Sequence, residues 1–145
     1  MGLFDAMTTA ASGVDANQTW LNAVSDNIAN LNDVTTTSQG AYQTRYVIMA
    51  AAPGQPGGTG PGSALDASIG SGVEVAGVAL GSPAGVVEYD PQSPLADKQG
   101  MVRAANVDLG TQMTDMIMAQ EGYGANLATI SRAQQAYQAA LGLKV

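Results

Sequence analysis

The stretch LGTQMTDMIMAQEGYGANLATISRAQQAYQAAL (residues 109–141) decides how this chain folds. Two sets of residues recur in it at seven-residue steps: Leu109, Met116, Tyr123, Ile130 and Tyr137, and, four places after each, Met113, Gln120, Leu127, Gln134 and Leu141. A seven-residue repeat forms a narrow apolar stripe that packs against a partner helix, whereas a globular core needs a broader apolar face. The stretch therefore predicts a long helix that pairs with other helices.

The other end of the chain carries the same kind of repeat, at Met7, Val14, Leu21 and Ile28, with Ala10, Asn17, Val24 and Leu31 three places after each. We expect one helix from about residue 2 to residue 31, ended by Asn30, Asn32 and Asp33, whose side chains favour turns. The larger members of both repeats form the predicted subunit interface: Met7, Val14, Leu21, Val24, Ile28, Leu109, Met113, Met116, Tyr123, Leu127, Ile130, Tyr137 and Leu141.

The middle of the chain is poor in large apolar side chains and is interrupted by glycine and proline. Period-two patterns predict strands at 41–51, 72–80 and 84–89, and residues 101–107 are also expected to be extended. The Gly-Ser-Pro sequence at 81–83 predicts a hairpin turn between the second and third strands. Three prolines and five glycines within 53–62 predict a flexible loop. The last helix is expected to begin after a cap at Asn106 or Asp108 and to run to about residue 143.

These patterns predict an α+β fold, in which long N- and C-terminal helices form a coiled-coil-like pair and a small antiparallel β domain is inserted between them. The expected divisions are an N-terminal helix of the assembly core at 1–34, a β-rich middle domain at 35–104 and a C-terminal helix of the assembly core at 105–145. The narrow apolar stripe of each helix buries too little surface by itself to offset the conformational entropy that is lost when the terminal residues are ordered. We therefore expect neighbouring subunits to complete the terminal helices.

Composition argues against several classes of function. The chain has no cysteine and no histidine, so the usual nucleophile–base pairs and soft metal sites are absent. Asp90, Asp97 and Asp108 lack the dense spacing of a calcium loop, and we predict no catalytic residue, metal or cofactor. A net charge of −7 with five scattered cations argues against nucleic-acid binding. There is no apolar run of about 18 residues for direct membrane insertion, and the N-terminus lacks the features of a cleaved signal peptide.

Gly122 and Gly124 lie inside the last predicted helix, at a combined cost of roughly 2 kcal/mol relative to alanine. They either kink the helix or allow another helix to approach closely, which glycine permits because it has no Cβ. We favour the close approach.

Three ordered motifs are more specific than the repeats. The first, LNAVSDNIANLNDVTTT (21–37), is centred on Asn27-Ile28-Ala29-Asn30 and resembles the N-terminal signature of the flagellar axial proteins of bacteria. ANVDLGTQMTDMIMAQEGYGANLATI (105–130) resembles their C-terminal signature, which begins with Asn106-Val107-Asp108. The connector between them, YDPQSPLADKQGMV (89–102), looks like that of the proximal-rod branch of the family. Asn27 and Asn30 are expected to hydrogen-bond to the backbone near the end of the first helix.

The resemblance implies a structural, non-enzymatic subunit of the flagellar rod. Such proteins polymerise helically through their terminal helices, line the export channel and transmit torque across the periplasm. The implied partners are further copies of the chain, other rod proteins and the flagellar type III export apparatus, which exports the subunits without a cleaved signal peptide; the surrounding basal-body rings are a further candidate. Two alternatives stay open: another axial subunit of the rod or hook junction, and a secreted adhesin-type binding module that would be a stable monomer.

Overall fold

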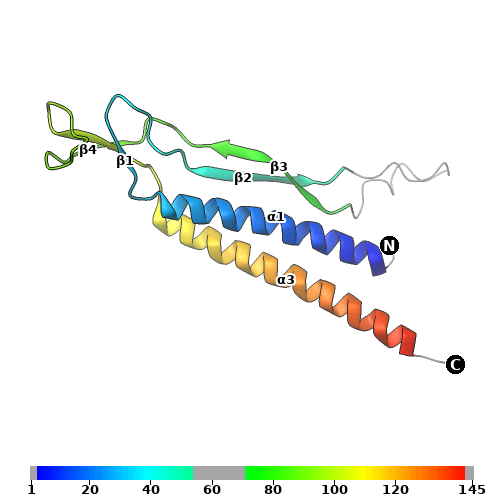
Figure 1. The fold of residues 1–145 in the computed structure, drawn as a ribbon. Helices are drawn as coiled ribbons and strands as arrows, with labels where there is room; N and C mark the ends of the chain where they lie inside the picture. The colour runs from blue at the N-terminus through cyan, green and yellow to red at the C-terminus, as the bar shows by residue number, and fades with distance from the viewer. Residues whose placement is uncertain (1–2, 54–70, 143–145) are drawn as a thin grey trace. The chain divides into compact units, whose positions relative to one another are not determined.

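The computed structural model describes residues 3–53 and 71–142. Its elements are, in order, α1 (Leu3–Ala29), β1 (Val34–Thr35), β2 (Arg45–Ala51), β3 (Val73–Leu80), β4 (Val86–Tyr89), β5 (Met101–Ala104) and α3 (Leu109–Gly142) (Figure 1). Two terminal helices with antiparallel strands between them in the sequence confirm the predicted α+β fold class. The predicted Gly/Pro loop lies, from residue 54 onward, outside the described residues.

The chain divides into two compact units, each of which takes part of both helices. Unit 1 consists of residues 1–19, 48–76 and 118–145, and unit 2 consists of residues 20–47 and 77–117. Unit 1 therefore holds the beginning of α1 and the end of α3, whereas unit 2 holds the end of α1 and the beginning of α3. Each unit contains its own contacts between the two helices.

Both helices agree closely with their predicted bounds. After α1 ends at Ala29, the N–H of Asn30 still donates to the carbonyl of Asp26 (3.1 Å). α3 begins directly after Asp108, whose carboxylate accepts a hydrogen bond from the N–H of Thr111 (2.8 Å). Of the two candidate caps, Asp108 is therefore the one that the helix uses.

Unit 2 contains a three-stranded antiparallel sheet in the order β1-β5-β4. Tyr89 at the end of β4 is paired with Met101 at the start of β5, so residues 90–100 form the loop of a β4–β5 hairpin. The N–H of Asp90 donates to the carbonyl of Gly100 across the base of this loop (2.9 Å). The short strand β1 adds to the other edge of β5.

β2 and β3 form a separate two-stranded sheet, so the predicted hairpin between residues 72–80 and 84–89 is wrong. The segment 81–83 does not reverse the chain, because its backbone bonds to the segment that precedes β2. The N–H of Gly81 donates to the carbonyl of Thr44 (2.8 Å), and the carbonyl of Pro83 accepts from the N–H of Ala41 (2.9 Å). The strand expected from residue 41 begins only at Arg45.

Gly85 turns the chain from this segment into β4. Its φ is 57°, in the left-handed region that side chains with a Cβ rarely adopt. A Cβ at this position would also lie 2.4 Å from the carbonyl oxygen of Ala104 and 2.5 Å from the Cβ of Ala41. Both the backbone angle and the surrounding space therefore require glycine.

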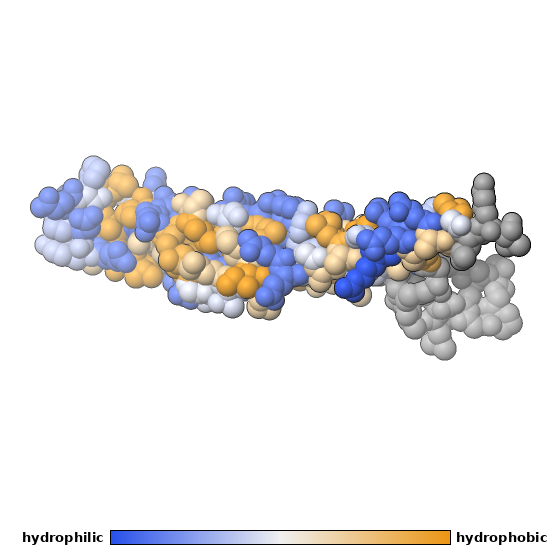
Figure 2. Space-filling view, turned by 90° about the horizontal axis from the view of Figure 1, so that it is seen from below, coloured by the Kyte–Doolittle hydropathy of each residue, from blue (hydrophilic) through white to orange (hydrophobic). Residues whose placement is uncertain are grey.

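The buried apolar side chains are small. Among residues 3–53 and 71–142, they are Val24, Val102, Ala10, Ala16, Ala23, Ala41, Ala104, Ala119 and Ala133. A methyl group contributes on the order of 0.8 kcal/mol when buried, far less than a Leu or Phe side chain. Many larger apolar residues remain at the surface, where Figure 2 shows them in patches between hydrophilic residues.

Candidate assembly surface on the terminal helices

In unit 1, α1 and α3 approach each other at two glycines. A Cβ on Gly13 would lie 2.6 Å from the amide nitrogen of Asn126, and a Cβ on Gly122 would lie 2.8 Å from the amide oxygen of Asn17. The close approach predicted at Gly122 is therefore confirmed, whereas a Cβ on Gly124 would meet nothing within 4 Å.

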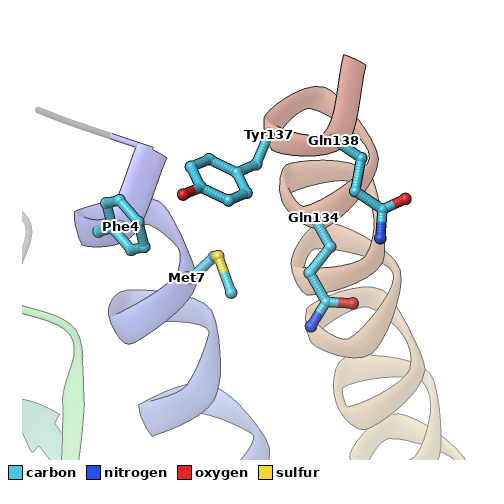
Figure 3. A pocket seen from close by; sticks show the side chains of 5 residues that line it. All are labelled: Phe4, Met7, Gln134, Tyr137 and Gln138. Atoms are coloured by element: carbon cyan, nitrogen blue, oxygen red, sulfur yellow. The ribbon is translucent and has the colours of Figure 1, made fainter. Parts of the chain in front are cut away.

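Aromatic side chains add to the helix contact in unit 1. Phe4 of α1 and Tyr137 of α3 meet edge to face, with ring centroids 5.6 Å apart and ring planes at 64°. Together with Met7, Gln134 and Gln138 they line a cavity of about 440 Å³ (Figure 3). Because Phe4 is still 65% exposed, much of its ring remains available to a further apolar group.

In unit 2, the side chain of Asn27 joins α1 to two other segments. Its amide nitrogen donates to the carbonyl of Arg45 (2.9 Å) and to Oε1 of Gln112 in α3 (2.8 Å). Its Oδ1 accepts from the N–H of Arg45 (2.8 Å) and from the hydroxyl of Tyr42 (3.0 Å). The side chain is 1% exposed, and a primary amide is the group that offers both two donors and a carbonyl acceptor. Burial raises the pKa of the Tyr42 hydroxyl, so it remains a donor at neutral pH.

The other residues of the N-terminal signature have local roles. Asn30 donates to the carbonyl of Asp26, one turn earlier (2.7 Å). The predicted backbone hydrogen bonds of Asn27 and Asn30 are therefore both present. Ile28 is half-buried and Ala29 is exposed.

The C-terminal signature leads the chain from β5 into α3. The carbonyl of Asn106 accepts a hydrogen bond from the hydroxyl of Thr44 (3.0 Å), and Val107 is half-buried. Hydrogen bonds from the hydroxyl and the N–H of Thr111 hold the pKa of the Asp108 carboxyl below its usual value. An ionised carboxylate at this position also interacts favourably with the positive end of the helix dipole.

Asp97 fixes the β4–β5 loop. Its carboxylate accepts hydrogen bonds from the N–H groups of Met101 and Gln99, both at 2.9 Å, and from the hydroxyl of Thr37 (3.1 Å). The bond from Met101 is the largest of the effects that lower the pKa of Asp97. The connector whose sequence resembles the proximal-rod branch is thus a structured loop that is tied to the residues after β1.

The interface residues predicted on α1 are covered to a large extent within the chain. Val24 is 2% exposed. The others are half-buried: Met7, Val14, Leu21 and Ile28. The apolar repeat of α1 therefore has most of its packing partners inside the single chain.

The interface residues predicted on α3 separate into two groups. Half-buried residues form the first group: Met116, Tyr123 and Ile130. The second group is at least 42% exposed: Leu109, Met113, Leu127, Tyr137 and Leu141. The large residues of the repeat that begins at residue 113, namely Met113, Leu127 and Leu141, are thus exposed. Leu109 and Tyr137 belong to the other repeat, and Tyr137 contacts Phe4.

A further set of α3 residues, one position before the exposed repeat, contacts α1 or is buried and was not predicted. These residues follow at seven-residue steps: Gln112, Ala119, Asn126 and Ala133. Gln112 is 3% exposed, Ala119 0% and Ala133 7%. A search for large apolar residues misses them because they are small or polar. The available signal is the sequence Gly-x-x-Ala-Asn, which occurs at 13–17 and again at 122–126.

Within residues 3–53 and 71–142, no three Asp or Glu side chains are grouped closely enough to hold a metal ion. Over the same residues, neither helix combines the length and the apolar character that a membrane span requires. The surface of interest is therefore the exposed apolar side of α3 and not a cluster of charged groups.

Comparison with known proteins agrees with these features. Residues 98–143, which include β5 and α3, match the family model described as the C-terminal part of the flagellar basal body rod FlgEFG proteins. This match defines the class as the flagellar basal-body rod proteins.

Individual relatives define the family more closely. The chain is 34% identical to the flagellar basal-body rod protein FlgC of Borreliella burgdorferi, over 99% of this chain and 98% of the relative. It is 31% identical to FlgC of Salmonella typhimurium, over 90% of each chain, and 38% identical to FlgC of Agrobacterium fabrum, over 86% of this chain and 83% of the relative. The chain belongs to the FlgC family of flagellar basal-body rod proteins, and the resemblance noted in its sequence is confirmed.

Proposed function

We propose that this chain is a structural, non-enzymatic subunit of the proximal rod in the flagellar basal body. In this proposal the subunits polymerise helically through the terminal helices, line the export channel and transmit torque across the periplasm. The assembly core comprises residues 1–34 and 105–145, and residues 35–104 form the β-rich middle domain. The partners are further copies of the chain, other rod proteins and the type III export apparatus, which exports the chain without a cleaved signal peptide; surrounding basal-body rings are a further candidate.

One observation carries the proposal, namely the exposed apolar residues on the outer side of α3. The term "outer side of α3" refers to five residues that are between 42% and 63% exposed: Leu109, Met113, Ile117, Leu127 and Leu141. Their successive spacings of 4, 4, 10 and 14 residues are close to whole numbers of helical turns, at 3.6 residues per turn, and place them along one side of the helix. α3 therefore leaves these five large apolar residues exposed, whereas its most buried residues, Gln112, Ala119 and Ala133, are small or polar.

The energetics favour subunit contacts over exposure to water. Burying the exposed half of one Leu, Ile or Met side chain contributes about 1 kcal/mol. The five residues of the outer side together supply roughly 5 kcal/mol per subunit. A stable, independent binding module would not leave this surface uncovered, since exposed apolar stripes of this kind promote association.

The test adds a charge to the outer side of α3 in cells that depend on this chain for swimming. Leu127→Asp should abolish rod assembly and swimming, because a carboxylate cannot be buried unpaired between subunits without a cost of several kcal/mol. Leu127 is already 44% exposed, so the fold of the single chain should tolerate the change. The matched control is Ala136→Asp, which adds the same charge at an exposed position nine residues along α3, on the opposite side of the helix from Leu127.

Measuring the amount of exported chain distinguishes a failure of assembly from a failure of secretion. Both variants should reach the periplasmic fraction in normal amounts, and only Leu127→Asp should be missing from purified basal bodies. Normal swimming of the Leu127→Asp cells would refute the proposal. If the unchanged chain were found in basal bodies at a position other than the proximal rod, it would be a different axial subunit.

A further inference from the structure

The contact between α1 and α3 in unit 1 rests on two short matching sequences. Residues 13–17 read GVDAN and residues 122–126 read GYGAN. Gly13 faces Asn126, and Gly122 faces Asn17. From the first pair to the second, the residue number rises on α1 (13 to 17) and falls on α3 (126 to 122), so the helices are antiparallel. Each glycine faces the asparagine of the other helix. We call these four residues the Gly–Asn clasp.

The asparagines of the clasp are held in place by their own helices. The amide of Asn17 donates to the carbonyl of Gly13 (2.7 Å), and the amide of Asn126 donates to the carbonyl of Gly122 (2.9 Å). An asparagine that rotated away from the facing glycine would lose this bond. A Cβ on Gly13 would lie 2.8 Å from Cγ of Asn126 as well as 2.6 Å from its nitrogen. Alanine therefore does not fit at this position while the amide stays where it is.

The clasp distinguishes the observed helix register from its neighbours. If α3 slipped by one turn in one direction, Asn126 would face Asn17, and two amides would occupy the space that now holds one. If it slipped by one turn in the other direction, Gly13 would face Gly122 and leave a gap. Of these three registers, only the observed one places each asparagine against a glycine of the other helix, and both overpacking and cavities destabilise a contact.

Unit 2 contains a polar contact between α1 and α3 that fits the same register. Asn27 lies fourteen residues after Gly13, and Gln112 lies fourteen residues before Asn126; these two side chains hydrogen-bond at 2.8 Å. Buried polar residues in paired helices are known to specify register at some cost in stability. The apolar repeats alone would permit registers that differ by whole turns.

We propose that the Gly–Asn clasp specifies the register in which α1 and α3 of one chain pair. It thereby also determines which residues of α3 are left on its outer side. The proposal concerns contacts within a single chain and holds whether or not the outer side of α3 binds neighbouring rod subunits.

Engineered cysteines can report the register, because the chain has no cysteine of its own. The pair Phe4→Cys with Tyr137→Cys reports the observed register, since the two rings that it replaces are in contact. The pair Phe4→Cys with Ala133→Cys reports the one-turn slip that brings Gly13 opposite Gly122. Because cysteine side chains are shorter than the rings, each pair is placed in the full chain and treated in flagellated cells with a short bifunctional thiol reagent such as dibromobimane, and the yield of intramolecular cross-link is measured.

Gly13→Ala should reduce the ratio of the first cross-link to the second by roughly tenfold, the effect expected of a moderately overpacked contact. Adding Asn126→Ala to Gly13→Ala should restore the ratio, because it removes the side chain that the new methyl group meets. Adding Asn17→Ala instead should not restore it, since Asn17 faces Gly122. Gly124→Ala is the matched control and should leave the ratio unchanged, because its Cβ would meet no neighbour.

The selective rescue separates register specification from a general loss of folding. A Gly13→Ala chain with the same cross-link ratio as Gly124→Ala would overturn the proposal. Equal rescue by Asn126→Ala and Asn17→Ala, or rescue by neither, would overturn it as well.

Discussion

Replacing Asn27 with aspartate tests the buried amide on which unit 2 depends. Asn27→Asp keeps the shape of the side chain but removes both amide donors. The carbonyl of Arg45 and Oε1 of Gln112, at 2.9 and 2.8 Å, would then face a carboxylate oxygen. Each buried acceptor left without its donor costs about 1–3 kcal/mol, so we expect a loss of roughly 2–6 kcal/mol. That is a large part of the total stability of a typical domain, which is about 5–15 kcal/mol.

The loss should depend on pH with a definite sign. A carboxyl group at a position that is 1% exposed, beside two acceptor oxygens, has its pKa in the folded chain raised above the unfolded value of about 3.9. The folded variant therefore binds its proton more tightly than the unfolded variant does. The variant should be least destabilised below about pH 4, and the destabilisation should grow as the pH rises through the raised pKa.

Thermal unfolding of the purified chain, followed by circular dichroism and by the fluorescence of Trp20, measures this effect. Asn32→Asp is the matched control, because it adds the same charge at an exposed position just beyond α1. At pH 7, a loss near 4 kcal/mol should lower the melting temperature of Asn27→Asp by roughly 10 °C, and the control should change it little. Equal melting temperatures for the two variants at pH 7 would refute the role that we assign to the Asn27 amide.

Two further predictions concern unit 2. Gly85→Ala should destabilise the chain by about 1–3 kcal/mol, because the φ of Gly85 is 57° and a Cβ there would overlap the carbonyl oxygen of Ala104. Denaturant unfolding measures this effect, and the control is Gly77→Ala, whose Cβ would have no neighbour within 4 Å. Similar unfolding midpoints for both variants would contradict the argument. Asp108→Ala should lower the melting temperature at neutral pH, because the ionised carboxylate accepts hydrogen bonds from Thr111. The pKa of Asp108 is lowered by folding, so its contribution is fully present above the unfolded pKa of about 3.9 and is lost as the pH falls through the lowered value. A difference between parent and variant that did not shrink as the pH was lowered from about 3.9 would count against this role.

The helices could be predicted from the sequence because their signals are local. Seven-residue repeats mark both of them, and the side chain of Asp108 satisfies backbone N–H groups only three residues away. The pairing of the strands depends instead on distant partners. The segment 81–83 reads as a turn by itself, but its backbone groups bond to Ala41 and Thr44, and no local pattern indicates that preference.

The same distinction applies to the candidate surface. The repeats indicated correctly that Met113 and Leu127 belong to an apolar stripe, but they did not show that α1 packs against the neighbouring series that contains Gln112 and Asn126. A glycine or an asparagine acquires its packing role only from the residue that faces it in the other helix. The signature residue Asn27 was noticed for its motif, yet its four hydrogen bonds reach segments that are remote in the sequence.

Electron cryo-microscopy of basal bodies assembled from this chain tests the central claim most directly. We expect Met113, Leu127 and Leu141, which are exposed in the single chain, to be buried against other subunits of the rod. Gly13 should meanwhile still face Asn126 of the same chain. A map in which those three apolar side chains face water would contradict the account.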